Sequence, residues 1–169
     1  VLKAGASEQL KVITTDVTTF LPAAPYDIIV SNPPFYQEDL KGAAQKRNWA
    51  FHDDTLTLSQ LLSFITRYLH SHGYFFLLLP TRRELEVMEL FHLAELTLVE
   101  KISVRATHEN SPHRLLLAGR RKQNTTNPRN LMVNEWSEPI TTQEICITNK
   151  EGAYSSAFTE LLKDYYLAL

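Results

Sequence analysis

Short apolar runs alternate along this chain with segments in which apolar residues recur at helical spacing. Runs rich in Val, Ile, Leu and aromatic residues predict strands at residues 27–31, 74–79, 96–105 and 115–121. Weaker alternation predicts two more strands, at residues 10–15 and 141–148. Helical spacing predicts helices at residues 57–71, 82–94 and 154–169, the first of them ended by Gly73, and residues 1–9 look like the tail of another. Strand, helix, strand, helix and then a hairpin predict an α/β protein whose doubly wound sheet ends in an antiparallel pair.

The strand at residues 27–31 runs directly into the tetrad Asn32-Pro33-Pro34-Phe35. Its β-branched centre suits a parallel strand that is buried on both faces. The two prolines then end the strand, because neither can donate a backbone hydrogen bond. They also make the chain stiff at this point. The sequence therefore predicts a rigid corner at the carboxyl end of a strand, which is where open α/β sheets bind their ligands.

The tetrad carries groups that could hold a planar amine. The Asn32 side chain offers a carbonyl acceptor, and the Pro33 carbonyl has no expected partner within the sheet. Phe35 adds a flat apolar face on which a ring could stack. If both acceptors engage one exocyclic nitrogen, its lone pair is drawn out of conjugation with the ring and turns toward an electrophile.

Composition and charge describe a single domain of ordinary size. The chain has 169 residues and a net charge of −2, so no overall attraction to nucleic acid is expected. Cys146 is the only cysteine, which excludes an intrachain disulfide and a cysteine metal cluster and fits a reducing cytoplasm. The apolar runs are too short to span a membrane.

Basic residues are nevertheless concentrated in two places, residues 41–52 and 105–122, which on charge alone suit solvated surface better than a binding site. The first lies in a long segment without periodicity, in which basic and aromatic residues alternate. Such a loop suits a nucleic acid strand with unstacked bases, although Trp49 and Phe51 suit a hydrophobic plug equally well. His52 fits a substrate or backbone contact better than a metal ligand, because no second ligand lies at helical spacing from it.

Asp16 follows the predicted strand 10–15. A carboxylate in this position suits an acceptor for the amino group or ribose hydroxyl of a bound nucleotide. It suits the cap of a helical turn equally well.

Asn-Pro-Pro-Phe after an apolar strand resembles the catalytic motif of S-adenosylmethionine-dependent methyltransferases that act on adenine, guanine or glutamine nitrogens. Residues 111–117, 154–158 and 164–167 are similar to the tRNA1(Val) (adenine(37)-N6)-methyltransferase family, and the resemblance extends over the chain from Asp16 onward. It implies a Rossmann-like methyltransferase fold with the antiparallel hairpin at the C-terminal side of the sheet. It further implies an enzyme of tRNA modification, with S-adenosylmethionine as methyl donor and the N6 nitrogen of adenine 37 in tRNA as acceptor.

The resemblance also implies roles for individual residues. The catalytic corner would be formed by Asn32, Pro33, Pro34 and Phe35, with Phe35 stacked on a flipped base. Asp16 would contact the adenine of S-adenosylmethionine, and Asn32 would border the same cofactor. Independently of the resemblance, the RNA-binding residues expected in the two basic stretches are Arg47, Trp49, His52 and Arg114. No metal is expected.

The sequence departs from the family pattern in its cofactor-binding part. None of the five glycines forms a Gly-x-Gly cluster, and the acidic residue that holds the cofactor ribose is missing. In the family both lie before the position at which this chain starts, so residues 1–169 are expected to form one partial domain, truncated at its N-terminus. We therefore expect the isolated chain to be inactive and to bind S-adenosylmethionine weakly. The exposed edge of strand 27–31 is expected to be covered by rearrangement of strand 10–15 or by a second copy of the chain.

Three other functions fit the tetrad. Glutamine N5-methylation of a release factor uses the same motif, usually with Tyr in place of Phe. Guanine N2-methylation of ribosomal RNA is a second alternative enzymatic activity. A non-catalytic RNA-binding fragment is the third alternative, which the missing cofactor turn favours.

Overall fold

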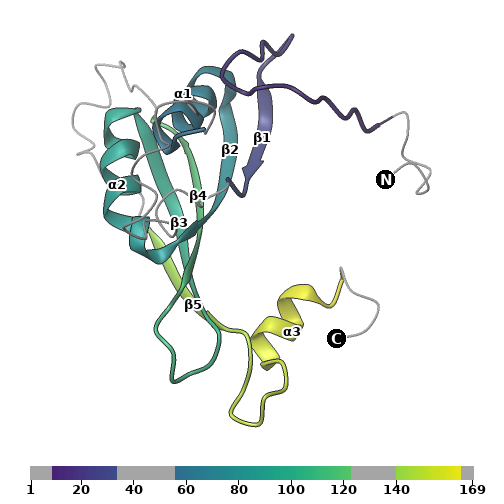
Figure 1. Cartoon of the computed structure of the whole chain (residues 1–169), viewed down its shortest axis with the longest axis vertical. Helices are drawn as coiled ribbons and strands as arrows, with labels where there is room; N and C mark the ends of the chain where they lie inside the picture. Colours follow the sequence, from purple (N-terminus) through teal and green to yellow (C-terminus); the bar gives the residue numbers. More distant parts are fainter. Residues whose placement is uncertain (1–8, 34–55, 123–139, 165–169) are drawn as a thin grey trace, which may run out of the picture.

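The computed structural model describes residues 9–33, 56–122 and 140–164. Within these ranges, five strands form one mixed sheet in the order β1-β2-β4-β3-β5 (Figure 1). In chain order the elements are β1 (Tyr26–Ser31), α1 (Leu58–Tyr68), β2 (Leu69–Pro80), the short 3-10 helix η2 (Thr81–Arg83), α2 (Glu84–Leu93), β3 (Leu96–Arg105), β4 (Arg114–Arg121), β5 (Thr141–Cys146) and α3 (Ser156–Leu162). The predicted α/β class is confirmed.

The directions of the strands place four of their carboxyl ends at one edge of the sheet. β1 pairs with β2 in parallel, β4 pairs antiparallel with both β2 and β3, and β5 pairs in parallel with β3. The predicted hairpin, β3 with β4, is thereby confirmed. Since only β4 runs in the opposite direction, the carboxyl ends of β1, β2, β3 and β5 all meet at the same edge of the sheet.

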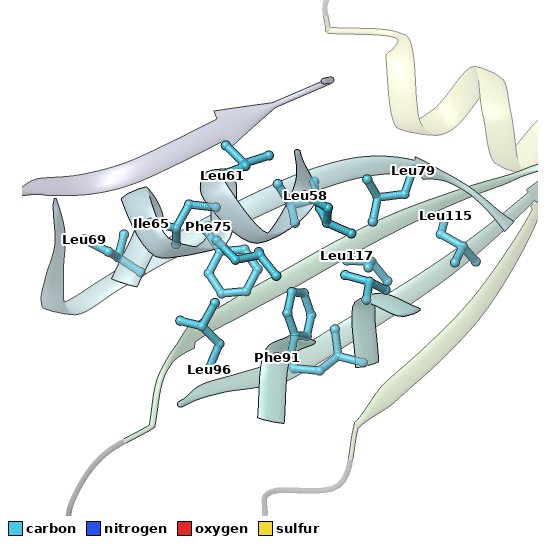
Figure 2. Packing of buried hydrophobic residues seen from close by; sticks show 14 residues of the cluster. Leu58, Leu61, Ile65, Leu69, Phe75, Leu79, Phe91, Leu96, Leu115 and Leu117 are labelled. Atoms are coloured by element: carbon cyan, nitrogen blue, oxygen red, sulfur yellow. The ribbon is translucent and has the colours of Figure 1, made fainter. Parts of the chain in front are cut away.

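The hydrophobic core lies between the sheet and the helices α1 and α2 (Figure 2). Phe75 of β2 and Phe91 of α2 meet edge to face, with their ring centroids 5.3 Å apart. α1 begins at a capping box in which Thr57 accepts from the Gln60 backbone N–H at 3.2 Å and donates its own N–H to Gln60 Oε1 at 2.8 Å. The helices predicted at 57–71 and 82–94 are found as α1 and α2, with their apolar stripes buried against one face of the sheet, although residues 69–71 belong to β2.

The strand predicted at residues 10–15 is wrong. Residues 9–15 carry no strand in the structure, and Leu10 and Val12 expose 56% and 81% of their surface. A strand needs a neighbour to accept and donate its backbone hydrogen bonds, and none of the described strands lies beside this segment. The helix tail predicted at residues 1–9 falls almost entirely outside the described residues.

The prediction that strand 27–31 is buried on both faces is also wrong. β1 is an edge strand of the described sheet, and its apolar residues Ile28 and Val30 are 62% and 74% exposed. Only Ile29, which points to the opposite face, packs against the core. Burial on both faces requires a strand or helix on each side, and the described residues supply these on one side only.

Gly73 does not end a helix. α1 stops at Tyr68, and Gly73 lies inside β2, which starts five residues earlier than predicted. A Cβ at Gly73 would come within 2.7 Å of the Asp27 carbonyl oxygen, so glycine allows the backbones of β1 and β2 to approach closely here. The closing helix is also shorter in the described part, where α3 covers Ser156–Leu162 and has no buried residue; residues 165–169 lie outside it.

Candidate active site

Asn32 and Pro33 form the exit of β1 at the carboxyl edge of the sheet. Parallel pairing with β2 continues to Ser31, opposite Leu77, and stops where the prolines begin. Pro33 is buried, whereas Asn32 is exposed and makes no side-chain hydrogen bond with another described residue. The amide of Asn32 is therefore available to a ligand at this edge.

A pocket of about 410 Å³ lies beside Asn32. Its walls come from β1, β2, β3 and β4 and are mainly apolar: Val30, Ser31, Asn32, Phe76, Leu77, Leu78, Glu100, Ile102, Leu116, Leu117 and Ala118. Because Phe75, Leu79 and Leu115 of the same strands are buried under the helices, the pocket occupies the face of the sheet turned away from α1 and α2. Its size and apolar lining are typical of sites for small molecules and for inserted side chains.

Glu100 is a pocket residue that sequence reasoning missed. An irregularity between Leu98 and Glu100 shifts the register of β3, which turns Glu100 toward the pocket and away from the helices. Gln143 of β5 donates its side-chain N–H to the Glu100 carboxylate at 3.1 Å. A lone acidic residue in an apolar strand was the available signal, but the bulge that directs it is invisible in the hydrophobic pattern.

The structure brings two of the sequence-predicted residues to the same edge. Arg114 opens β4 opposite Pro80, the last residue of β2, and is exposed at the carboxyl edge together with Asn32. Five other predicted site residues lie outside the described residues: Pro34, Phe35, Arg47, Trp49 and His52.

Asp16 is hydrogen-bonded within its own turn and is not among the residues that line the pocket beside Asn32. Its carboxylate accepts from the backbone N–H and the hydroxyl of Thr18, both at 2.8 Å, and its carbonyl accepts from the Phe20 N–H at 3.0 Å. The hydrogen bond from the Thr18 backbone, followed by that from its hydroxyl, lowers the pKa of the Asp16 carboxyl. The residues that follow Asp16 line a separate groove against α1. Of the two interpretations left open by the sequence, this geometry supports the cap of a turn.

The described residues hold no group of three His, Cys, Asp or Glu side chains placed to bind a metal ion. None of the helices in this part of the chain is both long enough and apolar enough to cross a membrane.

Comparison with known proteins gives relatives along most of the chain. The chain is 29% identical over 161 residues to the tRNA1(Val) (adenine(37)-N6)-methyltransferase of Pseudoalteromonas translucida, covering 95% of this chain and 63% of the relative. It is 28% identical over 168 residues to the protein of the same name from Pedobacter heparinus, covering 99% and 65%. The chain thus spans just under two thirds of the length of these curated relatives. No family model matches it.

Among solved structures, a predicted O-methyltransferase from Agrobacterium tumefaciens superposes with a TM-score of 0.59 at 12% sequence identity. The superposition covers 96% of this chain and 68% of that one. At this identity the likeness concerns the fold alone, and it supports the predicted Rossmann-like methyltransferase architecture. The resemblance stated from sequence is thus confirmed: along nearly its whole length the chain is a homologue of proteins named tRNA1(Val) (adenine(37)-N6)-methyltransferase.

Proposed function

We propose that the protein containing this chain methylates the N6 nitrogen of adenine 37 in a tRNA, with S-adenosylmethionine as the methyl donor. The observation that carries the proposal is the Asn32-Pro33 corner, which ends a parallel strand with an exposed amide at the ligand-binding edge. The relatives are named for this substrate and this position. Acting on tRNA, the protein would work in the cytoplasm.

The chain's own residues would bind and orient the adenine amino group. The side-chain oxygen of Asn32 and the carbonyl of Pro33 would each accept one of its two N–H bonds. Held in this way, the nitrogen loses conjugation with the purine ring, and its lone pair points away from the two acceptors toward the methyl group. When bound, the donor would supply an electrophilic methyl group: as the new N–C bond forms, the methyl–sulfur bond breaks and its electron pair stays on sulfur. The amine nitrogen would then lose its extra proton to solvent. Preorganised acceptors of this kind stabilise the developing positive charge.

The described residues do not form a complete site for S-adenosylmethionine. Asn32 fits a contact to the methyl donor, but the Asp16 carboxylate is engaged with Thr18, and the residues that follow it line a separate groove against α1. The described glycines, Gly73, Gly119 and Gly152, are far apart in the sequence and form no turn that could hold the donor. The role proposed for the described residues is therefore to bind and orient the adenine amino group.

The proposed function is tested by product analysis. The complete reading frame that encodes this chain would be expressed, and the purified protein incubated with bulk tRNA and tritiated S-adenosylmethionine. We expect label in N6-methyladenosine after digestion of the RNA. Label in N2-methylguanosine, or label only in a glutamine of a release factor added as a second substrate, would overturn the assignment in favour of one of the alternative methyltransferases. No transfer at all would support the non-catalytic RNA-binding reading.

The 169-residue chain by itself is expected to bind S-adenosylmethionine weakly, because its described residues supply only Asn32 to the donor. Isothermal titration of the donor into the isolated chain should show no saturation at micromolar concentrations. Saturable micromolar binding would refute the expectation.

The apolar face of β1 predicts self-association of the isolated chain. Ile28 and Val30 are exposed, and the backbone of β1 has one unpaired edge within the described sheet. Val30→Lys should shift the chain toward the monomer in sedimentation velocity at micromolar concentration. Leu85→Lys, which changes an 87% exposed residue on α2, is the matched control and should leave the distribution unchanged. A wild-type chain that sediments as a monomer would contradict the prediction.

A further inference from the structure

The connection between β3 and β4, residues 106–113, projects from the edge of the sheet at which the carboxyl ends of β1, β2, β3 and β5 meet. β4 begins at Arg114 opposite Pro80, whereas β1 pairs with β2 only as far as Leu77. The connection therefore extends past the end of β1 at the edge of the sheet where the carboxyl ends of β1, β2 and β3 lie (Figure 1). We call residues 106–113 the tongue.

Hydrogen bonds fasten the base of the tongue. The His113 N–H donates to the Val104 carbonyl at 2.9 Å, and the His113 carbonyl accepts from the Thr81 N–H at 3.3 Å, which ties the tongue to the exit of β2. On the other side, the Thr148 hydroxyl donates to the Ala106 carbonyl at 2.9 Å. Because the start of η2 on one side and the segment after β5 on the other hold its two ends, the base of the tongue is fixed relative to the sheet.

The tip of the tongue is also internally bonded. The Thr107 hydroxyl donates to Asn110 Oδ1 at 2.7 Å, and Arg105 donates to the His108 carbonyl at 3.1 Å. His108, Asn110 and the residues beside them are exposed polar groups. A surface that is both polar and preorganised binds a partner with little loss of conformational entropy.

Arg114 directly follows the tongue and is two residues before Leu116, a residue that lines the pocket. Leu115 and Leu117 of β4 are buried under the helices, whereas Leu116 lines the pocket on the other face. Side chains alternate along a strand, so Arg114 lies on the same face as Leu116. β4 is the second strand from β1 in the sheet, and Arg114 lies about two residues farther along the strand direction than Asn32. At ordinary sheet spacings the Cα atoms of Asn32 and Arg114 are therefore about 12 Å apart. This separation is comparable to the span of a nucleotide from its base to its phosphate.

The charges near the tongue distinguish Arg114 from its basic neighbours. Arg105 is paired with Glu144 of β5, and Arg83 is paired with Glu86 of α2. The Arg114 guanidinium donates to the His113 carbonyl at 3.1 Å and forms no ion pair with a described residue. Glu109 at the tip is the only acidic residue of the tongue. The guanidinium of Arg114 can therefore bind an anion without breaking a salt bridge.

We propose that Arg114 binds an RNA phosphate next to the target adenine, and that the tongue guides the RNA backbone to that position. The inference rests on the proposed function and adds the group that sets the distance between the base site and the backbone. Arginine suits this role because its planar guanidinium donates two parallel hydrogen bonds to a phosphate.

The test is RNA binding, which requires neither the methyl donor nor turnover. A fluorescently labelled anticodon stem–loop of tRNA1(Val) would be titrated with the chain, and anisotropy recorded over a series of salt concentrations. Loss of one phosphate contact should weaken binding about five- to eightfold at about 0.1 M salt and lower the slope of log K against log salt by about 0.7–0.9. We expect this from Arg114→Gln, with partial recovery in Arg114→Lys.

Arg120→Gln is the matched control, because it removes the same charge from the same face of β4 at its opposite end. It should change neither affinity nor slope by a comparable amount. An unchanged salt slope in Arg114→Gln, or an equal loss in both variants, would overturn the proposal. Since the readout is binding, a defect of Arg114→Gln in a protein that transfers no methyl group would support the phosphate site while the proposed reaction fails.

Discussion

Replacing Asn32 by Ala is expected to lower the rate of methyl transfer to tRNA at least ~10²-fold, as removal of one preorganised hydrogen-bonding group does in other active sites. The substitution takes away the side-chain acceptor that holds the adenine amino group and leaves only the Pro33 carbonyl. Asn32 is exposed and has no side-chain partner among the described residues, so the fold should be unaffected. The measurement is kcat/KM for tritium transfer by the protein expressed from its complete reading frame, with the circular dichroism spectrum as the check on folding.

Asn32→Asp tests whether the reaction needs the side-chain oxygen of residue 32 or its N–H group. A carboxylate of the same size retains an oxygen acceptor but loses the amide N–H. If acceptance of the amino group is what matters, Asp should retain clearly more activity than Ala. Equal activity of Ala and wild type would remove Asn32 from the reaction, and with it the proposed function.

The corner at Asn32-Pro33 could be predicted because its causes are local. Proline cannot continue a parallel ladder, and the position of such a break at the end of an apolar strand fixes the edge on which it lies. The direction of Glu100 could not be predicted in this way, since it depends on a register shift between β3 and β4. The register of pairing between strands decides which face of the sheet a residue is on, and this register cannot be predicted from the sequence of one strand alone.

Burial was harder to predict than secondary structure for a related reason. Ile28 and Val30 are as apolar as a buried strand requires, and β1 forms as expected, yet both side chains are exposed. The backbone conformation follows from local preference, whereas burial needs a neighbouring layer. Residues 10–15 show the limit of local preference, because their composition suits a strand but no described strand pairs with them and no strand forms. Sequence thus indicated the elements, while contacts between elements decided their environment.

Gly119→Ala is expected to destabilise the fold by about 2–3 kcal/mol, the upper part of the usual range for overpacking a tight core. Gly119 is buried in β4 directly opposite Phe75 of β2. A Cβ at this position would overlap Phe75 Cζ and lie 2.7 Å from Cε1 of the same ring and 2.8 Å from the Thr97 carbonyl oxygen. The ring cannot move away freely, because it is fully buried and packs edge to face on Phe91. Urea unfolding at fixed protein concentration would measure the loss.

Phe75→Leu provides the decisive second variant, because a shorter side chain leaves room for the added methyl group. Gly119→Ala should therefore cost about 1–2 kcal/mol less in the Phe75→Leu background than in the wild type, a coupling of the size found between residues in contact. Gly152→Ala is the control, since its backbone has φ of 83° and no atom lies within 4 Å of the added Cβ. Its cost arises from backbone strain and should be the same in both backgrounds. If Gly119→Ala costs the same in both backgrounds, the clash is with the Thr97 carbonyl and not with the ring, and the close approach of Phe75 to β4 does not determine this part of the core.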